Sequence, residues 1–316
     1  MTGLRDLGTS GLRLTPLVLG GNVFGWTADK ATSFRILDRF AEAGGVLIDT
    51  ADVYSAWVPG HKGGESEAVI GEWLRISGKR DQVLIATKVG MLDGEGGTKL
   101  APPRIAAACD ASLRRLGIDA IDLYFAHQDD DSVPQEHVLA AFGKLVDAGK
   151  VRAIGASNFT AERLGSALDI ATASGLPKYE ALQNEYNLVS RGKFEGALQA
   201  MCIERGVGSV PFYGLASGYL TGKYRSPADY AKSVRGGRMA PYLEGKGPAV
   251  LAAMDQVAAE TGASLAQIAL AWIAAQPGIT APIASATSVE QLDELLGFWN
   301  VTLTADQLDR LTAAGA

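Results

Sequence analysis

Short apolar segments of similar length recur along the chain, each followed by glycine, proline or polar residues. Val46, Leu47 and Ile48 are consecutive, whereas a strand with one solvent-facing side would alternate apolar and polar residues. Such runs indicate strands that are buried on both faces. The pattern predicts eight strands, which begin at Leu14, Val46, Val83, Ile121, Val151, Tyr179, Val207 and Ile279.

Between these strands, apolar residues recur every three or four positions, which is the period of a helix. The clearest predicted helices cover residues 65–76, 102–116, 134–148, 161–173 and 248–261. Pro102, Pro134 and Pro248 fit the first turn of a helix, and Gly117 and Gly149 fit helix ends. The interval between the starts of the seventh and eighth strands is about twice the others, so it must hold an additional loop or helix.

Alternation of strand and helix through the whole chain predicts a parallel fold. Eight βα units favour a closed (β/α)8 TIM barrel over an open sheet. Residues 4–14 place turn residues between two short flanks, which predicts an N-terminal β-hairpin that closes one mouth of the barrel. No linker or low-complexity tract divides the sequence, so we expect one barrel domain over residues 1–316.

Composition and charge narrow the class of protein. Hydrophobic residues make up 47% of the chain and charged residues 20%, a balance typical of a globular protein with a large core. The net charge of −6 argues against a nucleic-acid or anionic-membrane partner, because both attract basic surfaces. With neither a long apolar stretch nor the apolar segment of a signal peptide, the sequence predicts a cytoplasmic protein.

Metal ligation is not indicated by the sequence. Cys109 and Cys202 are far apart and belong to no CxxC or Cys/His cluster, so neither a disulfide framework nor a zinc site is predicted. His61, His127 and His137 are too scattered to suggest a metal site. We expect no bound metal.

Several polar residues fall at, or just beyond, the ends of the predicted strands. In a parallel barrel these ends form one mouth, where the active site lies. The mouth should therefore bring together Asp49, Tyr54, Lys88 and His127, an acid, a phenol, an amine and an imidazole. This combination suits proton transfer to a polarised carbonyl group. The same strand ends carry Ser157, Asn158 and Gln183.

The four ionisable groups can be given roles or a structural explanation. A tyrosine has a pKa of about 10, which a neighbouring ammonium lowers, so we expect Lys88 to lower the pKa of Tyr54 and Asp49 to keep Lys88 protonated. His127 would donate or accept a hydrogen bond at the substrate oxygen. Alternatively, Asp49 and Lys88 form a structural ion pair, Tyr54 is a rim aromatic and His127 a structural histidine.

Six segments resemble motifs of the aldo-keto reductases, in the order in which that family has them. They are IDTADVYS, ATKV, DLYFAH, GASNF, LQNEYN and LASGYLTGKY. The resemblance covers nearly the whole chain. It implies an eight-stranded α/β barrel that binds NADP(H) without a Rossmann domain and reduces a small aldehyde or ketone. The sequence agrees in having no G-x-G-x-x-G after a strand.

The resemblance also implies roles for individual residues. Tyr54 would be the general acid, Lys88 and Asp49 its tuning pair, and His127 the residue that orients the carbonyl. Ser157, Asn158 and Gln183 would hold the carboxamide of the nicotinamide. Further cofactor contacts are expected from Gly21, Asn22, Leu215, Ser217, Gly218, Lys223, Arg235, Ser285, Thr287 and Gln291. The loops should line the substrate pocket, with Trp26 and Trp57 among its residues.

Two departures from the family pattern bear on the cofactor. Phe212 stands where the family usually stacks a tyrosine under the nicotinamide, and Tyr213 follows it, so either ring could stack. Thr287 stands where many relatives carry an arginine that pairs with the 2′-phosphate. NADP(H) is therefore the expected cofactor, with NAD(H) as the alternative.

The segment 215–238 is locally basic. It contains Lys223, Arg225, Lys232, Arg235 and Arg238 against a single acid, Asp229. We expect either a solvated basic loop or a lid over the pyrophosphate.

Two classes of function fit the sequence. The first is a carbonyl reductase. The second is a cofactor-binding regulatory subunit with little turnover, because the family includes channel-associated β-subunits. Retention of all four of Asp49, Tyr54, Lys88 and His127 favours the reductase. The natural substrate and the oligomeric state stay open.

Overall fold

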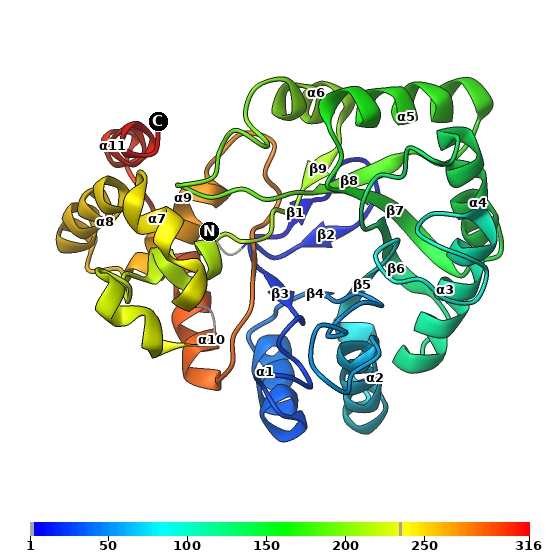
Figure 1. Ribbon diagram of the computed structural model, residues 1–316, viewed down its shortest axis with the longest axis horizontal. Helices are drawn as coiled ribbons and strands as arrows, with labels where there is room; N and C mark the ends of the chain where they lie inside the picture. The colour runs from blue at the N-terminus through cyan, green and yellow to red at the C-terminus, as the bar shows by residue number, and fades with distance from the viewer. Residues whose placement is uncertain (1–2, 234–235) are drawn as a thin grey trace.

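The computed structural model describes residues 3–233 and 236–316. In this structure, eight parallel strands are arranged in the order β10-β3-β4-β5-β6-β7-β8-β9. Their bounds are β3 (Val18–Gly20), β4 (Leu47–Asp49), β5 (Leu84–Val89), β6 (Ile121–Ala126), β7 (Val151–Ser157), β8 (Tyr179–Gln183), β9 (Gly208–Ser209) and β10 (Ile283–Ala284). Ser209 pairs with Ile279, and the Ile283 N–H donates to the Pro211 carbonyl at 2.8 Å, which joins the two edges of the sheet. The predicted (β/α)8 barrel is confirmed (Figure 1).

Helices follow the strands around the outside of the barrel. In chain order, the first six are α1 (Lys30–Glu42), α2 (Glu65–Ser77), α3 (Pro102–Leu116), α4 (Gln135–Asp147), α5 (Ala161–Ser174) and α6 (Ala197–Arg205). Gly117 ends α3 at φ 64°, a left-handed conformation that favours glycine. Pro134 was expected inside the first turn of α4 but is its N-cap, at ψ 130°, so the helix begins one residue later.

The N-terminal hairpin is present as predicted. It consists of β1 (Arg5–Asp6) and β2 (Arg13–Leu14), which pair antiparallel. Leu7 and Leu14 are fully buried in the hydrophobic cluster inside the barrel. The tip at Gly8 packs so tightly that a side chain there would meet the Gly208 nitrogen at 2.9 Å. The hairpin therefore closes the N-terminal mouth, and Figure 1 shows it across the middle of the ring of strands.

Three strands differ most from the prediction in their position or length, and each has a proline nearby. The strand expected from Leu14 begins at Val18, because Leu14 belongs to the hairpin and Pro16 lies between the two. The strands expected from Val207 and Ile279 are each two residues long, with Pro211 and Pro282 close after or before them. Proline lacks the N–H that a sheet ladder requires, so the ladder stops near it.

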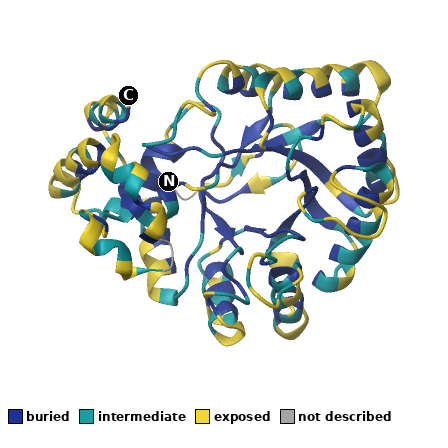
Figure 2. Cartoon of the chain, viewed as in Figure 1, coloured by how far each residue is buried: buried dark blue, intermediate teal, exposed yellow. Residues whose placement is uncertain are grey.

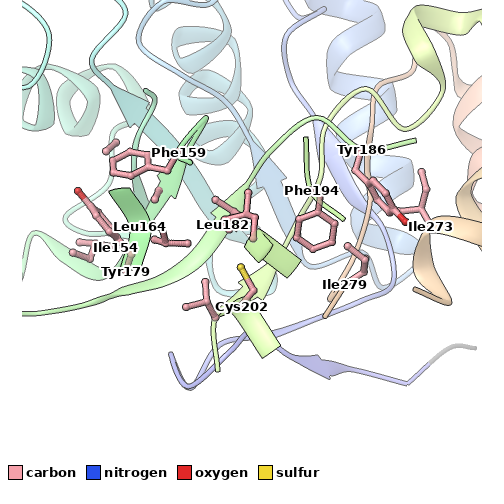
Figure 3. Close-up of a cluster of buried hydrophobic side chains, with 14 of the residues drawn as sticks. Ile154, Phe159, Leu164, Tyr179, Leu182, Tyr186, Phe194, Cys202, Ile273 and Ile279 are labelled. Atoms are coloured by element: carbon pink, nitrogen blue, oxygen red, sulfur yellow. The ribbon is translucent and has the colours of Figure 1, made fainter. Parts of the chain in front are cut away.

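Two layers of apolar side chains hold the barrel and its helices together. The inner layer lies inside the ring and includes Val18, Leu47, Leu123 and Phe125. The outer layer lies between strands and helices, and Figure 3 shows part of it around Tyr179 and Leu182 of β8. Figure 2 shows the resulting pattern, with buried strands and helices that expose only their outer faces. Strands covered on both faces explain the consecutive apolar residues of the sequence.

The long interval after β9 contains the predicted insertion. Its elements are η2 (Ala216–Thr221), η3 (Pro227–Lys232), η4 (Gly236–Arg238) and α7 (Ala240–Glu244). The chain continues through α8 (Gly247–Thr261), α9 (Leu265–Ala274), β10, α10 (Val289–Leu296), η5 (Gly297–Asn300) and α11 (Ala305–Ala314). Over the described ranges no single helix is long and apolar enough to cross a membrane; α8 and α9 reach that length only together, bent by 97°.

Candidate active site

The ammonium group of Lys88 is the centre of the site. Its Nζ donates to Asp49 Oδ2 at 2.8 Å, to the Thr50 carbonyl at 2.6 Å and to Tyr54 Oη at 3.1 Å. Lys88 is 0% exposed and Asp49 only 3%. The second carboxylate oxygen of Asp49 accepts from Gln183 Nε2 at 2.8 Å. Both oxygens of this buried carboxylate are thus bonded, as a buried charge requires.

The strands explain why these groups meet. Asp49 is the last residue of β4, and Lys88 lies near the end of the neighbouring strand β5. The turn after β4 is tied to β5 by two backbone hydrogen bonds, from Thr50 to Ala86 and from Asp52 to Lys88. Tyr54 lies at the end of that turn, which brings its phenol over the Lys88 ammonium. The predicted convergence of the three groups is present.

The pKa of Tyr54 differs from the expectation. Lys88 does act to lower the pKa of the phenol, as expected, but burial acts more strongly in the opposite direction, and the pKa of Tyr54 is raised. Burial alone would lower the pKa of Lys88, yet the nearby Asp49 carboxylate and the Tyr54 phenol raise it, so the amine stays charged. The phenol therefore keeps its proton at neutral pH and has a cation beside it.

His127 lies near the Tyr54 phenol. The centroids of the Tyr54 and His127 rings are 6.0 Å apart, and His127 is buried at the end of β6. Burial, and secondarily the positive charge of Lys88, holds the pKa of His127 well below its usual value, so the imidazole is neutral. A neutral imidazole has one N–H to donate. Among the described residues, His127 Nδ1 has no hydrogen-bond partner.

The ends of the next two strands, β7 and β8, carry two carboxamide side chains and one hydroxyl. Ser157 is the last residue of β7, Asn158 follows it, and Gln183 ends β8. Asn158 Nδ2 donates to the His127 carbonyl at 3.0 Å and to Ser157 Oγ at 3.1 Å. These donors and acceptors match the carboxamide of a nicotinamide, which needs both.

Phe212 and Tyr213 follow β9 at the same mouth. Phe212 packs against the cluster inside the barrel, whereas Tyr213 is 42% exposed with φ 57°. The two ring centroids are 5.1 Å apart. The ring planes are inclined by 74° to each other, so each ring presents a face of its own on which a flat aromatic group could stack.

The side of the mouth between β10 and β3 carries further residues with expected cofactor contacts. Gly21 is buried and its N–H donates to the Asp49 carbonyl at 2.7 Å, which ties this edge to the centre of the site. Ser285 Oγ donates to Asn22 Oδ1 at 2.6 Å. The Oε1 atom of Gln291 accepts a hydrogen bond from the backbone N–H of Thr287 at 2.9 Å.

Two basic residues of the insertion, Lys223 and Arg235, were expected to contact the cofactor. Lys223 is exposed, and a side chain at Gly218 would approach its Nζ within 3.2 Å. Leu215 and Ser217 are partly buried in the same turn. Arg235 lies outside the described residues.

Two other cations of the basic segment have acidic partners. Arg225 forms two bonds of 2.8 Å with Asp255, an acid outside the segment, and Lys232 pairs with Asp229 at 2.7 Å. The segment is therefore less positive than its own composition suggests.

The two tryptophans expected in the substrate pocket lie together beside Tyr54. The Trp26 and Trp57 rings are in edge-to-face contact, with centroids 5.6 Å apart, and the Tyr54 and Trp57 centroids are 5.7 Å apart. Trp57 is 48% exposed. Together they form an apolar wall next to the phenol.

The start of α2 contains functional contacts that sequence reasoning missed. The Glu65 carboxylate accepts from the backbone N–H groups of Ser55, Lys62 and Gly63, which holds the loop after Tyr54. Ser66 bonds to Thr50 at 2.8 Å and to the Gly21 carbonyl at 2.8 Å. The signal was present in the sequence: three polar residues open this helix directly after two glycines.

Two of the three aspartates after His127 have structural contacts. Asp129 pairs with Arg163, with one bond of 2.9 Å, and Asp130 accepts from the backbone N–H groups of Leu100 and Ser132. Within the described ranges, no group of three His, Cys, Asp or Glu residues is arranged to hold a metal ion.

Comparison with known proteins identifies the family. Residues 16–316 match the model of the aldo/keto reductase family. The chain is 34% identical to the uncharacterized oxidoreductase YrpG of Bacillus subtilis, over 96% of this chain and 93% of that protein. It is 30% identical to a probable voltage-gated potassium channel subunit beta of Oryza sativa, over 98% and 95%. It is also 30% identical to aldo-keto reductase yakc [NADP(+)] of Schizosaccharomyces pombe, over 89% and 82%.

The fold and these matches define the class of the protein as an oxidoreductase. The chain belongs to the aldo/keto reductase family.

Proposed function

We propose that the protein is an NADP(H)-dependent reductase that converts an aldehyde or ketone to an alcohol, with Tyr54 as the general acid. The observation that carries this proposal is the 3.1 Å contact between Lys88 Nζ and Tyr54 Oη, with Asp49 bonded to the same ammonium at 2.8 Å. The S. pombe relative named for NADP(+) supports the choice of cofactor. NAD(H) stays an alternative, because Thr287 provides no positive charge for a 2′-phosphate.

Each residue of the site has a role in this reaction. Tyr54 Oη donates its proton to the carbonyl oxygen, and the Lys88 ammonium stabilises the phenolate that remains. Asp49 keeps that ammonium in place, and the neutral His127 donates a hydrogen bond to the carbonyl oxygen. Bound NADPH would supply the hydride that adds to the carbonyl carbon. The phenolate then regains a proton from water.

Other residues would bind the two ligands. Ser157, Asn158 and Gln183 would hold the nicotinamide carboxamide, and Phe212 or Tyr213 would stack on the ring. The phosphate and adenosine part of the cofactor would contact Lys223, Ser217 and Asn22. Trp26 and Trp57 would contact the substrate. Their rings are apolar and pack edge to face, which suits contact with the apolar part of a small carbonyl compound.

The experiment that tests the proposal is reduction of an aldehyde by the purified protein, followed as NADPH oxidation. Tyr54→Phe should lower turnover about 10²- to 10⁴-fold, the usual contribution of a general acid, and should leave NADPH affinity nearly unchanged. Tyr230→Phe, the same substitution on η3, is the control and should keep full turnover. Unaltered turnover in Tyr54→Phe would refute the assignment.

A second function is a regulatory subunit that binds NADPH with little turnover. The 30% identity to a probable channel subunit supports this function, whereas the 34% identity to oxidoreductase YrpG and the 30% identity to aldo-keto reductase yakc support turnover. The same assay separates the two. Tight NADPH binding without turnover on any of a panel of aldehydes, ketones and quinones would support the subunit.

A further inference from the structure

A second buried ion pair lies directly behind the turn that carries Tyr54. Asp52 belongs to this turn and is 1% exposed. Arg104, from the first turn of α3, is also buried, and its Nη2 donates to Asp52 Oδ2 at 3.2 Å. A buried arginine is costly unless its donors are satisfied, so its other bonds show what it holds.

The other donors of Arg104 hold the loop that follows β5. Nε donates to the Leu92 carbonyl at 3.0 Å, and Nη1 lies 3.5 Å from the Glu95 carbonyl. A side chain at Gly63 would meet Leu92 Cδ2 at 2.9 Å, so this loop also packs against the loop after Tyr54. One guanidinium thus joins the two loops that follow β4 and β5, the strands that carry Asp49 and Lys88.

The charges around Asp52 act on its carboxyl group in opposite directions, and Arg104 favours the ionised form. Burial and the nearby carboxylate of Glu67, on α2, raise the pKa of Asp52 to about 7, while Arg104 and Arg115, on α3, act in the opposite direction. The hydroxyl of Tyr124, on β6, faces the same region. Among the described residues, Asp52 Oδ1 has no hydrogen-bond partner, and Oδ2 accepts from Arg104.

We propose that Arg104 is a positioning residue for carbonyl reduction: it holds residues 50–55 and residues 91–97 against α3 and thereby keeps the Tyr54 phenol beside Lys88. Its three nitrogens contact two loops of the mouth and no residue of its own helix. Loss of these bonds should let the turn shift, and a small displacement of a proton donor lowers the rate strongly. This proposal rests on the proposed function, because it concerns the same reaction.

The test uses Arg104→Met, which keeps an unbranched apolar side chain and removes the donors, and Arg104→Lys, which keeps one cation. Arg114→Met, at an exposed position of the same helix, is the matched control. We expect kcat for an aldehyde to fall about tenfold or more in Arg104→Met, with the KM for NADPH nearly unchanged. Arg104→Lys should recover part of kcat, and Arg114→Met should match the wild type.

Hydrogen exchange of residues 50–55 and 91–97 provides a measurement that needs no turnover. Both segments should exchange faster in Arg104→Met and at the wild-type rate in Arg114→Met. A folded Arg104→Met variant with wild-type kcat, or with wild-type exchange in both segments, would overturn the proposal. If Arg104→Met does not fold, Asp52→Asn is measured in the same two ways, and unchanged values there also overturn it.

The two proposals can fail separately. If the wild-type protein reduces no carbonyl compound, the proposed reductase function is wrong, and hydrogen exchange alone decides whether Arg104 holds both loops. If the wild type is active and Arg104→Met is equally active, only the positioning role is wrong.

Discussion

The two sides of the barrel mouth are built differently. On the side of β4, β5 and β6, Asp49, Lys88 and His127 are buried, and their hydrogen bonds join different strands. On the side of β10 and the insertion, polar side chains are half-buried or exposed; some bond to near neighbours, as Gln291 does with Thr287, and others pair across elements at the surface, as Arg225 does with Asp255. The first arrangement fixes donors before any ligand arrives, which is what stabilisation of a transition state requires. The second leaves groups that a bound cofactor can recruit.

The largest expected effect comes from breaking the buried side. Lys88→Met removes the cation and leaves the Asp49 carboxylate buried with only Gln183 as a side-chain partner. Breaking a buried ion pair in this way costs about 3–5 kcal/mol. We expect the free energy of unfolding to fall by that amount. Carbonyl reduction should be abolished, or should persist with a higher apparent pKa of the general acid in the pH–rate profile.

Urea unfolding and a pH–rate profile measure these two effects. The control is Lys193→Met, which removes an ion pair with Glu185 from a lysine side chain that is 70% exposed, and which should cost less than about 1 kcal/mol. Equal losses of stability in the two variants would mean that the depth of burial does not distinguish the two kinds of pair.

A smaller effect is expected from His127, whose protonation should make the free energy of unfolding depend on pH. Burial and the charge of Lys88 lower the pKa of His127, whereas the unfolded chain has the ordinary value of about 6.5. Below pH 6.5 the unfolded state therefore binds a proton that the folded state does not. Stability from the neutral imidazole is complete above that pH and is lost, by up to about 1.4 kcal/mol per pH unit, as the pH falls.

This loss of stability at low pH is tested by urea unfolding of the wild type and of His127→Gln at pH 7.0 and pH 5.5. The variant should lose about 1 kcal/mol less than the wild type over this interval. His137→Gln, at an exposed position on α4, should behave like the wild type. If His127→Gln loses as much stability as the wild type, then His127 is protonated in the folded protein.

Sequence alone predicted the buried side better than the exposed side. Asp49 and Lys88 could be placed because a strand buried on both faces has a recognisable end, and strand ends meet in a parallel barrel. The bond between Gln183 and Asp49 joins positions far apart in the chain and depends on the register of packed strands. The direction of the pKa shift of Tyr54 was missed because it depends on how deeply the phenol is buried.

On the exposed side, composition was misleading. The count of charges in residues 215–238 did not include Asp255, which folds back onto Arg225 from α8. A local sum of charge predicts an electrostatic field only when no acid from another element approaches.

The smallest expected effect is that of Arg225→Gln. The two side chains are 45% and 50% exposed, so loss of the pair with Asp255 should lower the free energy of unfolding by less than about 1 kcal/mol, and by less still at high salt. NADPH affinity should hardly change, because both terminal nitrogens of the Arg225 guanidinium already donate to Asp255. Lys223→Gln is the matched comparison, since Lys223 is exposed in the same segment. A tenfold loss of NADPH affinity in Arg225→Gln would show that Arg225 exchanges Asp255 for a phosphate, and the insertion would then be a lid that closes on the cofactor.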